Sequence, residues 1–272
     1  NESLEGFGMD FSYAQRRLME ILKLKSYPIG LRLLVDGEQP QEDAIRPLRD
    51  IKHNISMCQA FTIARREGKV IAMMKEDNWC FAPVISYGMA SLPERFLMGY
   101  SRYPYDVHSR EHGEFWARNE FPYIEGLNGQ RVHGTEIGPL SLLKRPPHVV
   151  IIYGEPAQIV WLVNASSFWD GRDIKAKLSG HAACAYAVAG VLKEDEPKVV
   201  LPCVGERRRA YAQDNELSFS LPAKKLEKIV EALEELERRE GGLIPFSVSL
   251  LPKHPLKESY KEIAREIGIK ID

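Results

Sequence analysis

The sequence has few cysteines, no excess of charge of either sign and no long apolar run, and each shortage excludes a class of protein. Its 272 residues include 37 Lys and Arg against 38 Asp and Glu, which argues against a general polyanion binder and predicts no nucleic-acid partner. No apolar run reaches the roughly 18 residues that a membrane span needs, and no basic-then-apolar leader opens the chain. We therefore expect a cytoplasmic protein with no membrane partner.

Several motifs that identify enzymes from sequence are also missing. The chain has no GxxxxGK[ST] phosphate loop, no GxGxxG dinucleotide fingerprint and no GxSxG nucleophile elbow. None of its four cysteines lies in a CxxC, so ferredoxin and zinc-ribbon spacings are absent. No motif therefore identifies a class of reaction, and the sequence leaves open whether the protein is an enzyme.

What the sequence does contain is an alternation of apolar strands and amphipathic helices, which predicts one domain over residues 1–272 of the α/β (or α+β) class. The continuous apolar run at 149–153 is typical of a strand covered on both faces. Residues 101–137 show little periodicity, and we expect an irregular insertion there. Two helices and a short strand at 246–250 are predicted for the C-terminal part, 223–272.

Two stretches of the chain repeat the same order of a cysteine, a helix, a strand and a second cysteine. Cys58 and Cys80 stand 22 residues apart, and Cys184 and Cys203 stand 19 apart. An apolar strand precedes each copy. This pattern predicts two pseudo-repeated α/β halves, about 26–100 and 145–222, packed about a pseudo-twofold axis.

The repeat accounts for all four cysteines and predicts that they meet near that axis. Cys58 and Cys184 are expected at helix N-termini, which favour thiolate, and Cys80 and Cys203 at the ends of strands. Four thiolates are the ligand set of an iron–sulfur cluster, with Cys₄ zinc as a second choice. A site that uses two or three of them, and cysteines that merely pack as small hydrophobes, are the open alternatives.

Two other groups of residues near the cysteines could carry chemistry. Arg207 and Arg208 closely follow Cys203 and predict a site for a small anion, the alternative being a solvated run of charge. His181 precedes Cys184 by three residues, which would place both on one helix face as a Cys/His pair. A histidine that only caps the helix beside a packed cysteine is the alternative.

Several of these stretches together resemble a known prokaryotic family. They are the run from Met57 to Arg65, Asn78-Trp79-Cys80, Ser179-Gly180-His181, Cys203 to Arg207, and Phe219 to Pro222. The sequence is similar in them to the uncharacterised family labelled domain of unknown function 169, which is common in archaea and anaerobic bacteria. The resemblance implies a prokaryotic, often anaerobic, cytoplasmic setting, which favours an oxygen-sensitive cluster. It implies no activity.

The leading hypothesis is an iron–sulfur or other Cys-ligated metal protein that serves electron transfer or reductive chemistry on a small anionic substrate. Its site residues are the metal ligands Cys58, Cys80, Cys184 and Cys203, with Arg207, Arg208 and His181 on the side of the substrate. The expected partner is a small anionic molecule or a redox partner protein, and a homo-oligomer is left open. The alternative is a metal-free module that binds an anionic metabolite or a tetrapyrrole-like cofactor between the halves. A third hypothesis is nucleophilic catalysis by Cys184 with His181.

Overall fold

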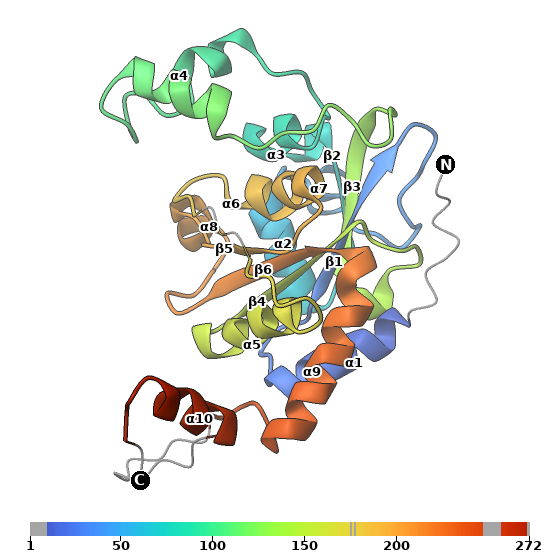
Figure 1. Ribbon diagram of the computed structural model, residues 1–272. Helices are drawn as coiled ribbons and strands as arrows, with labels where there is room; N and C mark the ends of the chain where they lie inside the picture. Colours follow the sequence, from blue (N-terminus) through green and yellow to red (C-terminus); the bar gives the residue numbers. More distant parts are fainter. Residues whose placement is uncertain (1–9, 175, 177, 247–256, 271–272) are drawn as a thin grey trace.

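A six-stranded antiparallel sheet forms the centre of the molecule in the computed structural model, which describes residues 10–174, 176, 178–246 and 257–270 (Figure 1). The strand order is β2-β3-β1-β4-β6-β5, and all the pairings between these strands are antiparallel. The strands are β1 (Ile29–Val35), β2 (Ile71–Met74), β3 (Val132–Pro139), β4 (Val149–Gly154), β5 (Lys198–Val200) and β6 (Leu217–Pro222).

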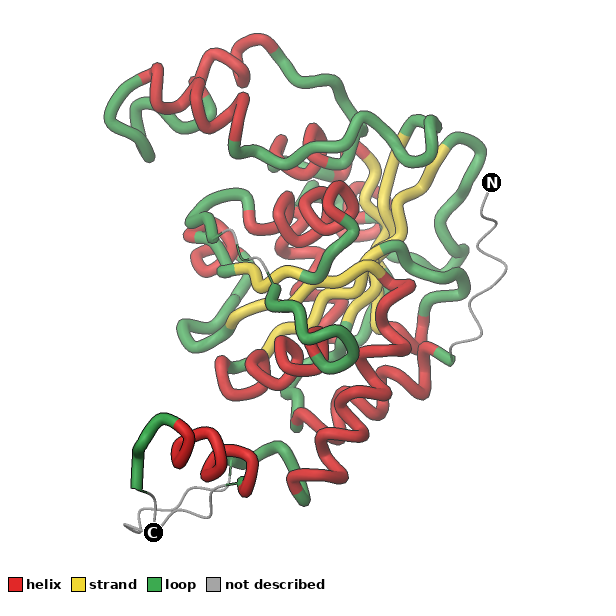
Figure 2. Tube along the Cα trace, viewed as in Figure 1, coloured by secondary structure: helices red, strands yellow, loops and turns green. Residues whose placement is uncertain are grey.

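Helices cover both faces of the sheet (Figures 1 and 2). One face carries α2 (Met57–Glu67) and a helical run made of α6 (Ala183–Ala185), η6 (Tyr186–Gly190) and α7 (Val191–Glu194). The other carries α1 (Phe11–Leu22), α5 (Pro156–Ser167) and α9 (Leu226–Glu240). In β4 the odd-numbered side chains join the first core and the even-numbered ones the second. The run at 149–153 is therefore apolar because its strand is covered on both faces, as expected. The predicted α/β (or α+β) class is confirmed in its α+β form, since the sheet is antiparallel.

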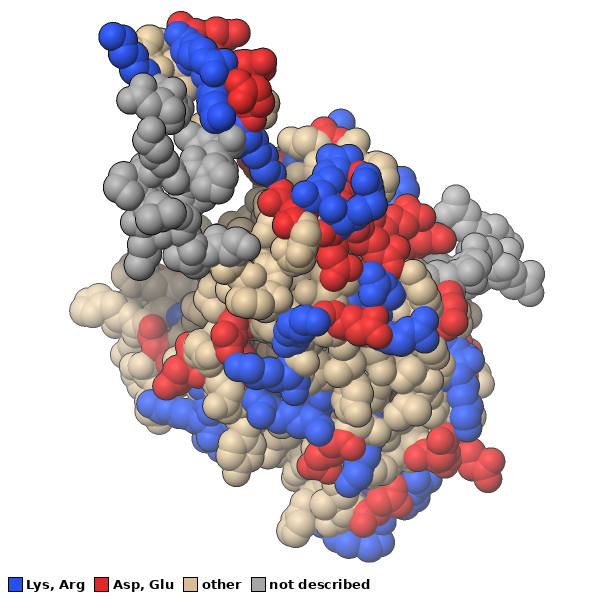
Figure 3. Space-filling view, turned by 90° about the horizontal axis from the view of Figure 1, so that it is seen from below, with Lys and Arg blue, Asp and Glu red and all other residues tan. Residues whose placement is uncertain are grey.

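The remaining elements are short and lie mostly around the face that carries α2. They are η2 (Pro47–Ile51), η3 (Lys75–Asp77), α3 (Phe81–Ser86), η4 (Phe96–Tyr100), α4 (Arg110–Asn119), η5 (Leu140–Leu142), α8 (Val204–Arg209), η7 (Ala223–Lys225) and the C-terminal α10 (Glu258–Glu266). None of the helices in the described part of the chain is long and apolar enough to cross a membrane. Acidic and basic side chains intermix on the face shown in Figure 3, in keeping with the balanced composition.

The predicted insertion at 101–137 needs correction at its C-terminal end. Residues from Val132 onward form β3, the second strand of the sheet, rather than irregular chain. Glycines hide this strand in the sequence, because they interrupt its apolar pattern. A Cβ at Gly134 would come within 2.3 Å of the Met74 sulfur in the neighbouring strand, so a larger residue there would displace the Met74 side chain.

The strand order is compatible with two equivalent halves, because β1 and β4 meet at the centre with β3 and β6 beside them. The pseudo-repeat nevertheless stays a prediction. The strand expected at 246–250 lies, apart from its first residue, outside the described residues.

Candidate functional site

Each of the four cysteines lies at the start of a helix. Cys58 and Cys184 are the second residues of α2 and α6, as expected. Cys80 and Cys203 were expected at the ends of strands, but they are the N-cap residues of α3 and α8. The short turns after β2 and β5 carry the chain beyond the strand and directly into a helix, which is why the expectation was wrong.

The packing of these helices brings the two halves of the sequence together. Helix α2 packs against α8, and α3 packs against α6. The Thr62 hydroxyl of α2 donates to the carbonyl of Ala210, directly after α8. The buried Tyr87 hydroxyl, just past α3, donates to the carbonyl of Cys184 at 2.9 Å. Each cysteine from the first half is thereby held beside one from the second.

The four free thiols share one neighbourhood. Hydrogen bonding to Cys184 and Cys203 raises the pKa of Cys58 well above its usual value, and burial adds to this. Burial raises the pKa of Cys80 to about 12, with further contributions from the negative charges that Cys184 and Cys203 would carry. Cys58 and Cys80 are therefore neutral thiols at neutral pH.

Cys203 behaves in the opposite way. Its pKa is lowered to about 5, first by a hydrogen bond with Cys58 and then by the backbone N–H groups of Ala183, Glu206 and Gly205, against the effect of burial. These donors come from the first turn of α8 and from the start of α6. Because they all stabilise the negative form, Cys203 is a thiolate at neutral pH.

The gathered thiols are not a ready-made chelate. Across residues 10–174, 176, 178–246 and 257–270, no group of three or more His, Cys, Asp or Glu side chains is arranged so that it could hold a metal ion. The sulfurs share hydrogen bonds among themselves and with the backbone instead.

A buried acid lies one helical turn from Cys203. The carboxyl of Glu206, whose residue is only 3% exposed, accepts a hydrogen bond from the Tyr153 hydroxyl. Burial raises its pKa to about 7. The Arg65 guanidinium lies 4.1 Å from the centre of the Tyr153 ring and forms two hydrogen bonds, of 2.8 and 2.9 Å, with the Glu216 carboxylate.

Sequence reasoning missed this network because its members look like surface residues. Arg65 lies in an amphipathic helix followed by a second arginine, yet it is 1% exposed. Glu206 opens a run of charged residues in the sequence. No local pattern distinguishes a buried member of such a run from its solvated neighbours.

The rim of the cysteine site is apolar and positively charged. Trp79, Phe81 and Val204, each directly beside Cys80 or Cys203 in the sequence, are exposed. The Arg209 guanidinium lies 5.2 Å from the centre of the Trp79 ring, and its charge favours the thiolate form of Cys80. Arg209 was not among the residues selected from the sequence.

The selected polar residues occupy different places. Arg207 is engaged by the loop after α8, where it donates to the carbonyls of Gln213 and Glu216. Arg208 is exposed and has no ion-pair partner among the described residues. His181 lies before α6 begins, so the expectation that it shares a helix face with Cys184 is wrong. Its Nδ1 lies 3.6 Å from the Asp106 carboxylate instead.

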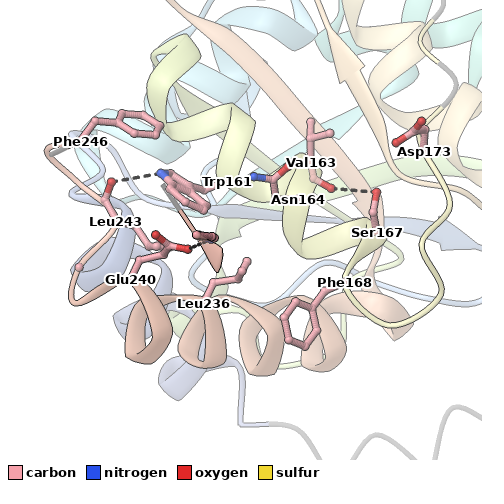
Figure 4. A pocket seen from close by; sticks show the side chains of 12 residues that line it. Trp161, Val163, Asn164, Ser167, Phe168, Asp173, Leu236, Glu240, Leu243 and Phe246 are labelled. Carbon is pink, nitrogen blue, oxygen red and sulfur yellow. Dashed lines mark hydrogen bonds and ion pairs between the residues drawn. The ribbon is translucent and has the colours of Figure 1, made fainter. Parts of the chain in front are cut away.

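A separate cavity of about 570 Å³ lies on the opposite face of the sheet, between α5, α9 and the chain after α9 (Figure 4). The Trp161 indole donates to the carbonyl of Leu243 there and stacks on Phe246. The residues that line this cavity include none of the cysteines. It is a different site from the one described above.

Comparison with known proteins places this arrangement in an uncharacterised group. The family model described as DUF169, Uncharacterised ArCR, matches residues 17–232, a range that includes all four cysteines. The chain is also similar to the uncharacterized protein MJ0308 of Methanocaldococcus jannaschii, with 25% identity over 225 residues, which are 82% of this chain and 93% of that protein. No solved structure matches.

Proposed function

The chain belongs to the DUF169 family, which is described as uncharacterised, and we propose a function from its cysteines: they bind an iron–sulfur cluster for electron transfer or for the reduction of a small anion. The observation that carries the proposal is the meeting of all four cysteines of the chain, from four separate helix starts. The sulfurs interact with one another across the two halves of the chain, which burial in the apolar core does not by itself require.

The backbone around the sulfurs supports this proposal. Three N–H groups point at Cys203, and the N–H of Ala82 points at Cys80. Hydrogen bonds of this kind stabilise negative charge on sulfur and are one of the means by which proteins set the potential of an iron–sulfur cluster.

The arrangement favours a cluster over a single zinc ion. Tetrahedral zinc with Zn–S bonds of about 2.3 Å requires four sulfurs only ~3.8 Å apart from one another. In an iron–sulfur cluster the cysteines bind different iron atoms, so their sulfurs lie farther apart from one another than around a single zinc ion. That no described group of donors is arranged to hold an ion is therefore a stronger argument against zinc than against a cluster.

The number of cysteines that bind decides the chemistry. Four ligands leave no open position on iron, which favours electron transfer; three leave a position at which a substrate could bind. Cys58, Cys184 and Cys203 are linked by hydrogen bonding, whereas Cys80 joins them only through charge. If one cysteine is not a ligand, Cys80 is the one.

Replacement of each cysteine by serine tests the proposal. The variants are purified without oxygen, and iron and sulfide are measured per chain. We expect each of Cys58→Ser, Cys184→Ser and Cys203→Ser to lose most of the bound iron. Val204→Ser, which adds a hydroxyl beside Cys203 but removes no sulfur, should keep it. Iron that stays unchanged in all of the cysteine variants would contradict the proposal.

A metal-free module that binds a small anion is the second candidate. The lack of a ready-made chelate favours it, as do Arg208, which has no ion pair among the described residues, and the exposed Arg209 on the rim. In that case Arg208→Gln and Arg209→Gln would weaken the binding of the anion, while the cysteine variants would bind it as the unaltered protein does. The two candidates thus differ in which set of variants loses its ligand.

A further inference from the structure

A cavity of about 320 Å³ lies between α3 and η4 and is lined almost entirely by apolar groups. Its walls come from one stretch of the chain, residues 81–101, which runs from α3 through a connecting loop into η4. Phe81, Val84 and Ile85 belong to α3, while Phe96 and Tyr100 belong to η4. The volume is at the lower end of the range for small-molecule sites, about 300–1,000 Å³, and suits a molecule of one or two fused rings.

Two aromatic side chains of this wall are uncovered. Phe81 is 54% exposed and Tyr100 is 40% exposed, although both line the cavity. Phe96 also lines the cavity but is buried, with its ring centre 6.0 Å from that of Phe81 in an edge-to-face arrangement. An exposed aromatic wall with a packed aromatic base is a surface on which a flat ring gains contact area.

Arg95 is the only charged residue among those that line the cavity. Its guanidinium lies 4.8 Å from the centre of the Tyr100 ring and has no acidic partner among the described residues. The Tyr100 hydroxyl interacts with Arg110, whose own charge is partly offset by Glu111 and Glu114, so Arg95 carries the uncompensated charge of the site. With no carboxylate in the lining, the field of the cavity favours an anion.

We propose that this cavity binds a planar aromatic molecule with one negatively charged group. The ring rests against Phe81 and Tyr100, and the carboxylate, or a group like it, pairs with Arg95. Arginine suits this role because its planar guanidinium can bind a carboxylate with two hydrogen bonds while it stacks on an aromatic ring.

The position of the cavity connects it to the cysteines without depending on a metal. Phe81 directly follows Cys80, and Cys80 packs against the same apolar cluster as Ile85 and Phe96. A ligand in the cavity would therefore lie next to the cysteine site. Because the lining contains no cysteine, the binding site is expected in the metal-free protein as well.

Two dyes with the same aromatic skeleton and different charge provide the test. 8-Anilinonaphthalene-1-sulfonate is an anion with a flat naphthalene ring system, and N-phenyl-1-naphthylamine is the same skeleton without the sulfonate. Binding of each is measured by fluorescence titration of the full-length, metal-free chain. We expect Arg95→Gln to weaken the anionic dye about tenfold and to leave the neutral dye within about twofold. Phe81→Ser should weaken both dyes.

Matched variants keep the result specific. Arg118→Gln removes an exposed arginine of α4 that lies outside the cavity, and Phe246→Ser alters the separate cavity of Figure 4; neither should change the binding of either dye. Circular dichroism confirms that each variant is folded. The proposal is overturned if the anionic dye does not bind, if Arg118→Gln weakens it as much as Arg95→Gln, or if Phe246→Ser rather than Phe81→Ser removes it.

Discussion

Cys58 and Cys203 are joined by a hydrogen bond across the two halves of the chain, and this bond is the main reason for the low pKa of Cys203. The same contact helps to raise the pKa of Cys58. One sulfur thus acts as donor and the other as a stabilised thiolate, which gives the site an asymmetry that a cluster of packed cysteines would lack.

The Cys58 donor can be tested with a pair of variants. In metal-free protein, Cys58→Ala removes the hydrogen-bond donor, so the pKa of Cys203 should rise from about 5 toward its usual value of 9. Cys58→Ser keeps a donor and should leave the pKa low. Titration of the ultraviolet absorbance of the thiolate measures both. Equal titration curves for the two variants would show that Cys58 does not hold the charge.

The raised pKa of the buried Glu206 implies that the folded state loses stability as the pH rises from 4.5 through 7. Its pKa is raised from the usual 4.5 to about 7, so the folded chain holds a proton that the unfolded chain has released between these values. Stability from this group is complete below pH 4.5 and falls as the pH rises through 7, by about 3 kcal/mol in the limit.

Glu206→Gln keeps an oxygen that can accept from Tyr153 but cannot ionise. We therefore expect the variant to be more stable than the unaltered protein at pH 8 and similar at pH 5. Urea unfolding at the two pH values measures the difference. A variant that is equally destabilised at both would mean that Glu206 is ionised in the folded protein.

For His148 we expect the opposite dependence of stability on pH. Burial lowers its pKa from 6.5 to about 4, and its Nδ1 accepts a hydrogen bond of 3.0 Å from the Leu33 N–H. The stability that the neutral His148 ring contributes is complete above pH 6.5 and is lost as the pH falls through 4. In His148→Asn, which retains an acceptor, unfolding free energy should vary less between pH 6.5 and pH 4. An unchanged slope in the variant would argue against this role.

Removing one partner of the Arg65–Glu216 ion pair should lower the stability of the fold strongly. Arg65→Met leaves a partly buried carboxylate without its two-pronged donor and should destabilise the fold by about 3 kcal/mol. Arg65→Met combined with Glu216→Gln should recover part of that loss, because no carboxylate remains to be neutralised. Chemical denaturation of the single and double variants gives the coupling. Strict additivity would mean that the pair is solvated.

The close approach of Gly99 to the backbone of α4 helps to hold the segment around α4 in place. Gly99 has a φ of +86°, and a Cβ there would come within 2.3 Å of the Glu114 nitrogen in α4. Gly129 has a similar φ of +78° but nothing within 4 Å of a Cβ, and so serves as the control. Gly129→Ala should cost about 1 kcal/mol, and Gly99→Ala about 3 kcal/mol. Hydrogen exchange in α4 should rise only in Gly99→Ala.

The fold class could be predicted because its signals are local. Continuous apolar runs and helical periodicity depend on near neighbours in the sequence, and they indicated a sheet covered on both faces. Strand β3 escaped notice because Gly134 and Gly138 are explained only by side chains of other segments that approach them. Its place beside β1 depends on pairing over a long separation in sequence, which no local pattern reports.

The candidate site could be predicted only in part from the sequence, for the same reason. The repeated order of cysteine, helix, strand and cysteine suggested that four distant residues belong together, although their role as ligands stays a prediction. Arg209, Glu206 and Arg65 could not be found, because their importance comes from what lies across from them: the Trp79 ring, the Tyr153 hydroxyl and the Glu216 carboxylate. Residue type and spacing carry no information about such partners.

The most direct test of the central claim is the metal content of the unaltered chain. The protein is produced in a host that assembles iron–sulfur clusters and purified without oxygen, and iron, acid-labile sulfide and zinc are measured per chain together with the visible spectrum. We predict iron and sulfide in equal, stoichiometric amounts, with a broad visible absorption that disappears in Cys203→Ser. Colourless protein that contains neither iron nor sulfide, and whose four thiols are all free, would contradict the account.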